Sequence, residues 1–403
     1  MPSARPNAPN LTQHVLALNS GSSSFKFGLY ALNGADSVRL LSGEARGVGS
    51  STSEFQVRGA AGDVLCIERA SLSNTQAVVG RIGRLLRERE SPIPQAIGHR
   101  VVHGGSKLRK HCRMDATVLH ELKEAEAFAP LHTTATLACI EAAQSQFPDV
   151  PHVACFDTVF HARMPARART LALPLALREQ GIERYGFHGL SCESIVQQLV
   201  QKPLERLPSR LLIAHLGNGA SVTAVREGVS IDTSMGLTPS GGLIMGSRSG
   251  DLDPGVLIYL ARERGFDAAM LEDLIDRQSG LTGISGLGGD MRTLHAAAAT
   301  NAQAVLAIDM FCYTVRKQLA AMWVALDGAD AIVFTGGIGE NDAAVRTEIC
   351  TGLSSLGVQL DEARHRMRTT LISNNASSCQ VYVLPSLEDE QIARHTAFLT
   401  SSI

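Results

Sequence analysis

Two short stretches of this chain, about 200 residues apart, join an apolar strand to a turn of small residues. They are residues 15–26 (VLALNSGSSSFK) and 211–222 (LLIAHLGNGASV). Gly and Ser leave backbone N–H groups exposed and add hydroxyl donors, so such a turn can surround an anion without steric cost. A single turn of this kind is equally typical of an ordinary β-hairpin. Two of them in one chain favour a site that holds a polyphosphate from two sides.

Neither turn is a standard nucleotide motif. Residues 21–26 have no second Gly before Lys26 and no Ser or Thr after it, so they are not a Walker A loop. Residues 217–219 lack the third Gly of a dinucleotide fingerprint. The polyphosphate would therefore be bound by a different type of phosphate-binding turn.

Two arginines occupy positions that a bound anion would account for. Arg100 is in the apolar strand predicted over residues 96–102, where a guanidinium is costly unless it meets an anion. Arg248 lies on a Gly- and Ser-rich loop. The alternatives are an internal salt bridge for Arg100 and a solvated surface position for Arg248. Beside two phosphate turns, both would neutralise a phosphoryl group in transfer.

Acidic residues and histidines supply further candidates. Asp157 ends the strand predicted over 153–157, at the carboxyl edge where α/β proteins bind ligands, although it could simply cap a turn. Glu388 begins the last helix, where an acidic first turn is favoured by the helix dipole alone. We place His132, His188 and His215 on loops, where each could bond a phosphate or carboxylate oxygen or be structural. Their spacing fits no standard metal site.

The order of elements predicts a duplicated α/β architecture. In the first half the strands are 26–30, 38–41, 55–57, 96–102 and 153–157, with helices at 73–89, 117–127 and 134–145. In the second half the strands are 211–215, 222–226, 229–232, 331–335 and 381–384, with helices at 254–264, 268–277 and 303–326. Both halves begin with an antiparallel meander that contains one of the two turns. We therefore expect the turns to face a cleft between the copies.

Composition limits the class of protein. A chain of 403 residues favours two domains, and a net charge of −2 gives no reason to expect nucleic acid or a membrane surface as partner. Eight cysteines without a Cys-x-x-Cys pair predict reduced thiols rather than a metal or redox site. Residues 1–13 are read as a loose extension without a signal peptide, and no apolar run has membrane-spanning length. We expect a cytoplasmic protein.

Several longer motifs occur together in one order. They are Asn19-Ser-Gly-Ser-Ser-Ser-Phe-Lys26, Gly98-His-Arg-Val-Val-His-Gly-Gly105, Phe156-Asp-Thr-Val-Phe-His161, Arg184-Tyr-Gly-Phe-His-Gly189, His215-Leu-Gly-Asn-Gly-Ala-Ser221, Asp232-Thr-Ser-Met-Gly236, Arg248-Ser-Gly-Asp-Leu-Asp-Pro254, Ser279-Gly280 with Gly283-Ile-Ser-Gly286, Gly337-Ile-Gly-Glu-Asn341, and Glu388 with Ile392-Ala-Arg394. Over residues 14–397 the chain thereby resembles the acetate kinase family, the short-chain carboxylate kinases of the acetate and sugar kinase, Hsp70 and actin superfamily.

The resemblance implies two duplicated ribonuclease H-like (actin-like ATPase) domains with an interdomain cleft. The N-terminal domain would comprise residues 14–160 and 390–403, and the C-terminal, nucleotide-binding domain residues 161–389. The implied reaction is a reversible, direct in-line transfer of the γ-phosphoryl group of ATP to acetate, giving acetyl phosphate and ADP. It would depend on Mg²⁺ or Mn²⁺. A homodimer is implied as well.

The resemblance also implies a role for each candidate residue. Asn19 and Glu388 would position the metal, directly or through water, and Lys26 would lie near the phosphates of ATP. Arg100 would bind the carboxylate, Arg248 and His188 would stabilise the transition state, and Asp157 is the family's essential acid. Further ATP contacts would come from His215, Leu216, Gly217, Asn218, Gly219, Asp290, Met291, Arg292, Gly337, Ile338, Gly339, Glu340 and Asn341. Val102, Leu131, His132, Phe187 and Pro239 would contact the acyl substrate together with Arg100.

Three loops depart from the family pattern. They are His132-Thr-Thr-Ala-Thr136, Gly189-Leu-Ser-Cys192, and Ser240-Gly241-Gly242, where an acidic residue is lost. Because one methylene changes discrimination by only about 1–3 kcal/mol, propionate or another short-chain fatty acid is an alternative substrate. A non-kinase nucleotide switch like actin or Hsp70 is the alternative from a different class. Such a switch would not need Arg100, His188 or an acyl pocket.

Overall fold

The structure is a computed structural model that describes residues 12–21, 24–50, 52–128, 130–201 and 207–401, without the side chains of residues 70 and 130–132. The chain forms two compact units. Unit 1 runs to Val159 and resumes at Leu387, and unit 2 runs from Phe160 to Ser386. Most of the predicted N-terminal extension, residues 1–11, lies outside the described residues. Glu388, which we assigned to the second domain, lies in unit 1.

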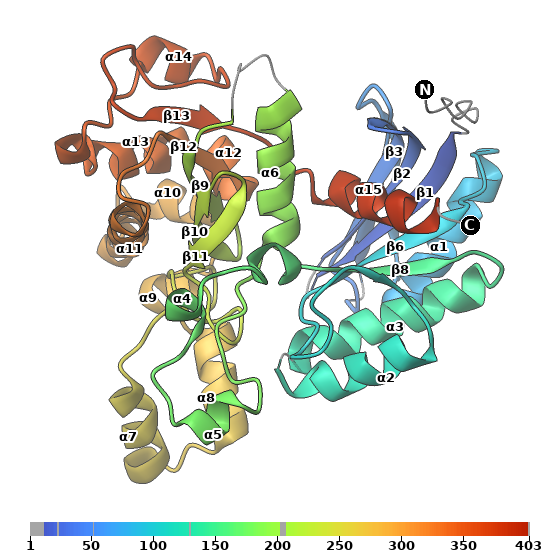
Figure 1. Ribbon diagram of the computed structural model, residues 1–403, viewed down its shortest axis with the longest axis horizontal. Coiled ribbons are helices and arrows are strands. Elements are labelled where there is room, and N and C mark those ends of the chain that lie inside the picture. The colour runs from blue at the N-terminus through green and yellow to red at the C-terminus, as the bar shows by residue number, and fades with distance from the viewer. Residues whose placement is uncertain (1–11, 22–23, 51, 129, 202–206, 402–403) are drawn as a thin grey trace, which may run out of the picture. The chain divides into compact units, whose positions relative to one another are not determined.

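Unit 1 is a mixed sheet with helices on both faces (Figure 1). The strand order is β5-β4-β3-β2-β1-β6-β8-β7. The strands are β1 (Gln13–Ser20), β2 (Ser24–Asn33), β3 (Asp36–Arg46), β4 (Ser53–Gly59), β5 (Val64–Ala70), β6 (Ala96–Val101), β7 (Cys112–Arg113) and β8 (His152–Phe156). The helices are α1 (Thr75–Glu88), α2 (Ala116–Glu124), η1 (Ala125–Phe128), α3 (Pro130–Gln146), η2 (Val159–His161, whose first residue alone belongs to unit 1) and α15 (Glu388–Thr400).

Local sequence explains the elements that cover this sheet. Asn74 caps α1 by accepting a hydrogen bond from the backbone N–H of Ala77. The apolar face of α1, with Val78 and Ile82, packs with α3 against β1 and β2. The opposite face of β1, β2, β6 and β8 is covered by α15. This arrangement places the beginning of α15 beside the carboxyl ends of the central strands.

Unit 2 repeats the centre of unit 1. Its strand order is β11-β10-β9-β12-β13, with β9–β10–β11 antiparallel and β9–β12–β13 parallel. Unit 1 has the same pairings in the order β3-β2-β1-β6-β8. The strands are β9 (Arg210–Leu216), β10 (Ala220–Arg226), β11 (Val229–Thr233), β12 (Ala331–Thr335) and β13 (Gln380–Val383). The predicted duplication is therefore confirmed.

The helices of unit 2 surround this sheet and extend it. Cys192 and Ile195 of α6 pack on Leu211 and Ile213, while α11 covers β9 and β10 from the other side. The helices are α4 (Ala166–Arg169), α5 (Leu175–Arg178), α6 (Gly189–Gln201), α7 (Pro254–Arg264), α8 (Ala268–Asp273), η3 (Leu274–Gln278), α9 (Gly280–Ser285), α10 (Met291–Ala297), α11 (Ala302–Ala325), α12 (Gly336–Asn341), α13 (Ala343–Thr351), η4 (Ser354–Leu356) and α14 (Glu362–Arg366).

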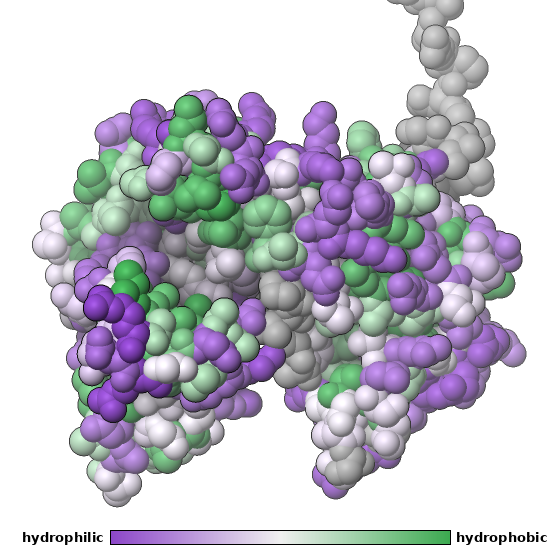
Figure 2. Space-filling model, turned by 90° about the horizontal axis from the view of Figure 1, so that it is seen from below, coloured by the Kyte–Doolittle hydropathy of each residue, from purple (hydrophilic) through white to green (hydrophobic). Residues whose placement is uncertain are grey.

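The surface gives two further facts. Figure 2 shows hydrophilic and apolar residues interspersed over the face that it presents. Among the described residues, no helix is both long enough and apolar enough to cross a membrane.

Gly98 allows α15 to approach the sheet. In a strand, alternate side chains share a face, so Gly98 and Arg100 of β6 both face α15. A Cβ atom on Gly98 would overlap the side chains of Ile392 and Thr396, which belong to α15. The missing side chain therefore sets the distance between α15 and the strand that carries Arg100.

We expect Gly98→Ala to destabilise unit 1 by about 1–3 kcal/mol, the usual cost of overpacking a close-packed core. Gly80→Ala is the matched control, because Gly80 lies inside α1 with only Arg84 within 4 Å of an added Cβ. That control should raise the free energy of unfolding by about 0.5–1 kcal/mol. Urea unfolding of both variants measures the difference. An equal effect of the two substitutions would contradict the proposed role of Gly98.

Candidate active site

Five polar side chains of unit 1 form one hydrogen-bonded cluster. Arg100 donates to Asp157 Oδ2 from Nε at 3.0 Å and from Nη2 at 2.6 Å, and to Asn19 Oδ1 from Nη1 at 3.2 Å. The amide nitrogen of Asn19 donates to Glu388 Oε2 at 3.1 Å and to Asp389 Oδ1 at 3.0 Å. The structure therefore brings together Asn19, Arg100, Asp157 and Glu388, all predicted as site residues. Arg100 makes the internal salt bridge that was the alternative for it.

The sheet topology explains this convergence. Asn19 is near the carboxyl end of β1, Arg100 is near that of β6, and Asp157 directly follows β8. Because β1, β6 and β8 are parallel neighbours, their carboxyl ends meet at one edge. Glu388 reaches the same edge because it begins α15.

Burial makes the charges of this cluster interdependent. Burial opposes the charged form of Arg100, but the charges of Asp157 and Glu388 outweigh it and keep the pKa of Arg100 above its ordinary value. Asp389 is half-buried, and this burial raises the pKa of its carboxyl group despite the hydrogen bond from Asn19. Asp389 was missed as a candidate. Its signal was only that it is the second acid in a run that begins at Glu388.

The donor set of this cluster fits a hard divalent cation in part. The carboxylates of Glu388 and Asp389 are the oxygen ligands that Mg²⁺ prefers. Asn19 turns its amide nitrogen towards them, since its oxygen accepts from Arg100. The acids can therefore serve as ligands, while Asn19 orients them. Lys26 is exposed on β2 and lowers the pKa of Asp389 by its charge, against the stronger effect of burial.

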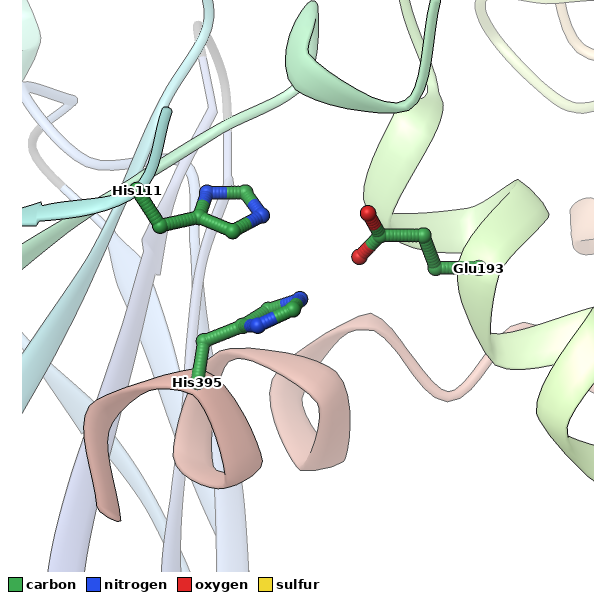
Figure 3. Close-up of side chains that lie close together, drawn as sticks. All are labelled: His111, Glu193 and His395. Carbon is green, nitrogen blue, oxygen red and sulfur yellow. The ribbon is translucent and has the colours of Figure 1, made fainter. Parts of the chain in front are cut away.

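Two histidines that we did not single out support this edge. The ring centroids of His111 and His395 lie 3.9 Å apart (Figure 3). His111 Nδ1 accepts a hydrogen bond from the backbone N–H of Phe156 at 3.0 Å, directly before Asp157. His395 belongs to α15, like Glu388. These rings thus link the end of β8 to that helix.

In unit 2, two predicted histidines stack beside the second turn. The rings of His188 and His215 have centroids 4.1 Å apart and planes inclined by 23°. Each ring Nδ1 bonds a serine hydroxyl, Ser221 for His188 at 2.9 Å and Ser191 for His215 at 2.8 Å. His215 lies within β9, so our placement of it on a loop was wrong. The serines fix both rings and direct their Nε2 atoms towards the turn.

Gly219 is the point where these side chains converge. A Cβ atom on Gly219 would lie 3.1 Å from His188 Nε2 and 3.5 Å from Arg248 Nη1. Arg248 is half-buried and donates to the carbonyl of Pro239 at 3.3 Å, so it is not the solvated surface arginine of the alternative. Only a glycine leaves this space open. An anion at the turn would meet both an imidazole and a guanidinium.

The backbone around His188 is strained and held in place. His188 has φ +58°, a conformation that non-glycine residues rarely adopt and that is often retained at functional sites. His161 donates from Nε2 to the carbonyl of Phe187 at 2.9 Å and accepts from Ser230 at Nδ1. Burial lowers the pKa of His161 to about 4, so its ring is neutral at pH 7. It therefore positions His188 without adding charge.

The other predicted nucleotide residues border the same turn. The turn places the carbonyl of Asn218 3.0 Å from the backbone N–H of Gly246, and a Cβ atom on Gly217 would lie 3.7 Å from the nitrogen of Gly337. Leu216 ends β9 and is buried. Residues 336–341 form the helix α12, which also holds Ile338, Gly339 and Asn341. Glu340 accepts from the backbone N–H groups of Gly336 and Ser386, which indicates a structural role.

Asp290, Met291 and Arg292 begin α10. Asp290 caps this helix and pairs with Arg292 at 2.6 Å, while Met291 is buried. The preceding Gly289 lies against the backbone of Gly246, which itself bonds the turn.

The predicted acyl-contact residues divide between the units. Val102 is buried in unit 1, and Phe187 and Pro239 are buried in unit 2. Leu131 and His132 lie in α3, so His132 is not on a loop as we expected, and their side chains lie outside the described part of the chain. Ser22 and Ser23 of the first turn also lie outside the described residues. Of the departures, Cys192 is a core residue and Ser240 bonds Asp276.

Comparisons with known proteins agree along the chain. A model of the acetokinase family matches residues 14–394. An acetate kinase of Deinococcus radiodurans is 43% identical over 403 residues, covering 96% of this chain and 98% of that protein. The structure superposes on a propionate kinase from Francisella tularensis with a TM-score of 0.89 at 36% identity, and on a Porphyromonas gingivalis acetate kinase with a TM-score of 0.82 at 33% identity. They cover 96% of this chain and 100% and 99% of those chains.

We expect Asp157→Asn to lower the free energy of unfolding of unit 1 by about 3–5 kcal/mol, because it leaves the Arg100 charge without its buried partner. Asp330→Asn is the matched control. It removes the partner of Arg210, where both side chains of the pair are more than a third exposed, and should cost less than about 1 kcal/mol. Denaturant unfolding measures both. Similar losses in the two variants would contradict the importance of burial here.

Proposed function

Because this chain belongs to the acetokinase family, we propose that it is an acetate kinase that transfers the γ-phosphoryl group of ATP reversibly to acetate. The products are acetyl phosphate and ADP. The observation that carries this proposal is the convergence of His188 and Arg248 on Gly219, because an imidazole and a guanidinium at a glycine turn suit a phosphoryl group.

The main obstacle in this reaction is charge repulsion. Acetate is already an anionic nucleophile, so it needs no strong base, but it must approach a polyanion. A carboxylate oxygen forms the new bond to the γ-phosphorus as the bond to the bridging oxygen breaks, and that oxygen leaves with the electron pair on ADP. The protein therefore contributes cations and orientation rather than proton transfer.

We assign the positioning of the carboxylate and of the metal to unit 1. Arg100 binds the acetate carboxylate, and Asp157 fixes the guanidinium through two hydrogen bonds to Oδ2. Glu388, with Asp389 beside it, would hold Mg²⁺ or Mn²⁺ directly or through water, and Asn19 orients both acids. Such a metal ion would neutralise charge on the phosphate oxygens. Lys26 lies near the phosphates.

We assign ATP and the transferred group to unit 2. The turn around Gly217, Asn218 and Gly219 carries the phosphates, while α12 and the start of α10 hold the adenosine. His188 and Arg248 stabilise the equatorial oxygens in the transition state. Serine-bound Nδ1 atoms keep the Nε2 atoms of His188 and His215 aimed at the turn. Asp157 then serves orientation and not proton abstraction.

A second substrate is supported by a specific observation. The Francisella tularensis protein whose structure superposes with a TM-score of 0.89 is described as a propionate kinase. Phe187 and Pro239 are apolar and buried, and their side chains carry no polar group that would disfavour one more methylene. Propionate is therefore the alternative substrate. A nucleotide switch without a carboxylate substrate is the less supported class.

We also propose a cytoplasmic homodimer. None of the residues of α7, all of which are described, is buried, although Val256, Ile258 and Tyr259 are apolar. These three side chains are 43–56% exposed. A helix with such exposed apolar residues suits contact with a second copy of the chain.

Acyl phosphate formation tests the function directly. The chain with ATP and Mg²⁺ should produce ADP and a hydroxylamine-trappable acyl phosphate only when a carboxylate is present. A kcat/KM series for acetate, propionate and butyrate then identifies the preferred acyl chain. ADP release at the same rate without any carboxylate would contradict the kinase and favour the nucleotide switch.

Arg248→Ala should lower kcat by roughly 10³- to 10⁵-fold, the effect of removing an arginine that stabilises a phosphoryl-transfer transition state. Arg226→Ala is the control, because Arg226 is an arginine of the same unit that pairs with the exposed Asp327 at the far end of β10. Its kcat should stay unchanged. Near-normal kcat with a raised KM in Arg248→Ala would contradict the assigned role.

A further inference from the structure

Arg346 is an arginine buried in unit 2, and no carboxylate of the described residues is hydrogen-bonded to it. Its side chain belongs to α13 and is 2% exposed. Nη1 donates to the carbonyl of Gly339 in α12 at 2.8 Å, and Nε donates to His365 Nε2 in α14 at 3.2 Å. Burying a guanidinium is costly, so its partners must repay that cost. Here both partners are neutral acceptors.

The contact with Arg346 fixes the protonation state of His365. Because Nε of arginine can only donate, Nε2 of His365 must be an unprotonated acceptor. Its proton therefore lies on Nδ1, which faces the hydroxyl oxygen of Thr347 at 3.4 Å. A proton on Nε2 would turn an N–H group towards another N–H group and place two cations in contact. Burial first, and then the Arg346 charge, lowers the pKa of His365.

The same helix α13 connects to the other predicted adenosine segment. Asp342 caps α13 by accepting from the backbone N–H of Val345, and its Oδ2 lies 2.8 Å from Nε2 of His295 in α10. Thus α13 holds the carbonyl of Gly339 at one contact and α10 at another. The start of α10 carries Asp290, Met291 and Arg292.

We propose that Arg346, held by neutral His365, is a positioning residue that sets the affinity of α12 for the nucleotide. We propose further that this affinity falls on acidification, when His365 is protonated. This inference rests on the proposed function, since it requires that α12 contacts adenosine. Arg346 touches no substrate and acts through the carbonyl of Gly339. When His365 takes up a proton, the Nε contact is lost and the hold on α12 loosens.

The charged groups around the pair allow this response. Asp342 of the α13 region favours the charge of Arg346, and Arg368, which follows α14, opposes it. Burial raises the pKa of the Cys350 thiol to about 12, so this neighbour stays neutral. His365 meets the charge of Arg346 itself. Since Arg346 remains a cation, protonation of His365 adds a second positive charge, and this charge is buried.

Calorimetric titration of the full chain with ADP tests the proposal. Arg346→Met should raise the Kd for ADP by about tenfold or more, as expected when a buried hydrogen bond from a charged group is lost. Arg316→Met is the matched control, because Arg316 also packs against α13 but meets Glu348 and Gly352 at its far end. Its Kd should change by less than about twofold.

His365→Gln tests the protonation step. A glutamine oxygen can still accept from Arg346 but cannot take up a proton, so this variant should match the unsubstituted chain at pH 7.5. As pH falls through the lowered pKa of His365, the Kd of the unsubstituted chain should rise relative to that of His365→Gln, by up to about tenfold per pH unit below that pKa. Comparing the two at each pH cancels the protonation of ADP and of the other histidines.

Amide hydrogen exchange without nucleotide gives an independent readout. Arg346→Met should speed exchange in residues 336–341 and leave β9 unchanged, whereas general unfolding would speed both. Unchanged ADP affinity and unchanged exchange in α12 would overturn this inference alone. A parallel pH response of His365→Gln and the unsubstituted chain would overturn its acid step. Absence of ADP binding by the unsubstituted chain would overturn the proposed function as well.

Discussion

The buried ion pair between Arg100 and Asp157 is the interaction on which unit 1 depends. A guanidinium at the end of an apolar strand would be expelled unless an anion met it, and Asp157 meets it with two hydrogen bonds to one oxygen. Asn19 accepts a hydrogen bond from Arg100 Nη1 and donates from its own amide nitrogen to Glu388 and Asp389. The edge of the sheet is therefore one connected network. No member of it can change its charge without affecting the others.

Unit 2 solves the problem of positioning differently. Its site depends on neutral groups: serine hydroxyls hold His188 and His215, and the neutral ring of His161 holds the carbonyl before His188. Such groups cost less to bury than charges, and they leave Arg248 as the cation nearest Gly219 among the described residues of that cluster. The two units thus share a strand order, but their candidate site residues are positioned by charged groups in unit 1 and by neutral groups in unit 2.

Apolar periodicity and capping residues are local signals, and from them the sequence predicted the strands common to both units, β4, and the helices α1, α2, α3, α7, α8, α11 and α15. It did not predict β5, β7 or the remaining helices, among them α6 and α13. Asn74, which caps α1, is one such local signal. The partner of Arg100 was not predictable, because it depends on β6 and β8 becoming neighbours over more than 50 residues of chain. The inward turn of Glu340 and the burial of Arg346 were missed for the same reason. The hydrogen bond from Ser386 to Glu340 spans 46 residues of chain and that from Arg346 to His365 spans 19, so local sequence does not reveal them.

The balance of charge in unit 1 argues for what the site needs from outside. Lys26 and Arg100 supply two positive charges near three acids, Asp157, Glu388 and Asp389. Because Asp157 already compensates Arg100, this edge has little positive potential to offer a phosphate. Burial first, and then the charge of Glu388, raise the pKa of Asp389 more than Asn19, Lys26 and Arg100 lower it. A divalent cation at Glu388 and Asp389 would remove that imbalance and attract the phosphate. Under the proposed function, the acids that make this edge unfavourable for a phosphate alone are therefore those that would suit it to a phosphate with a metal ion.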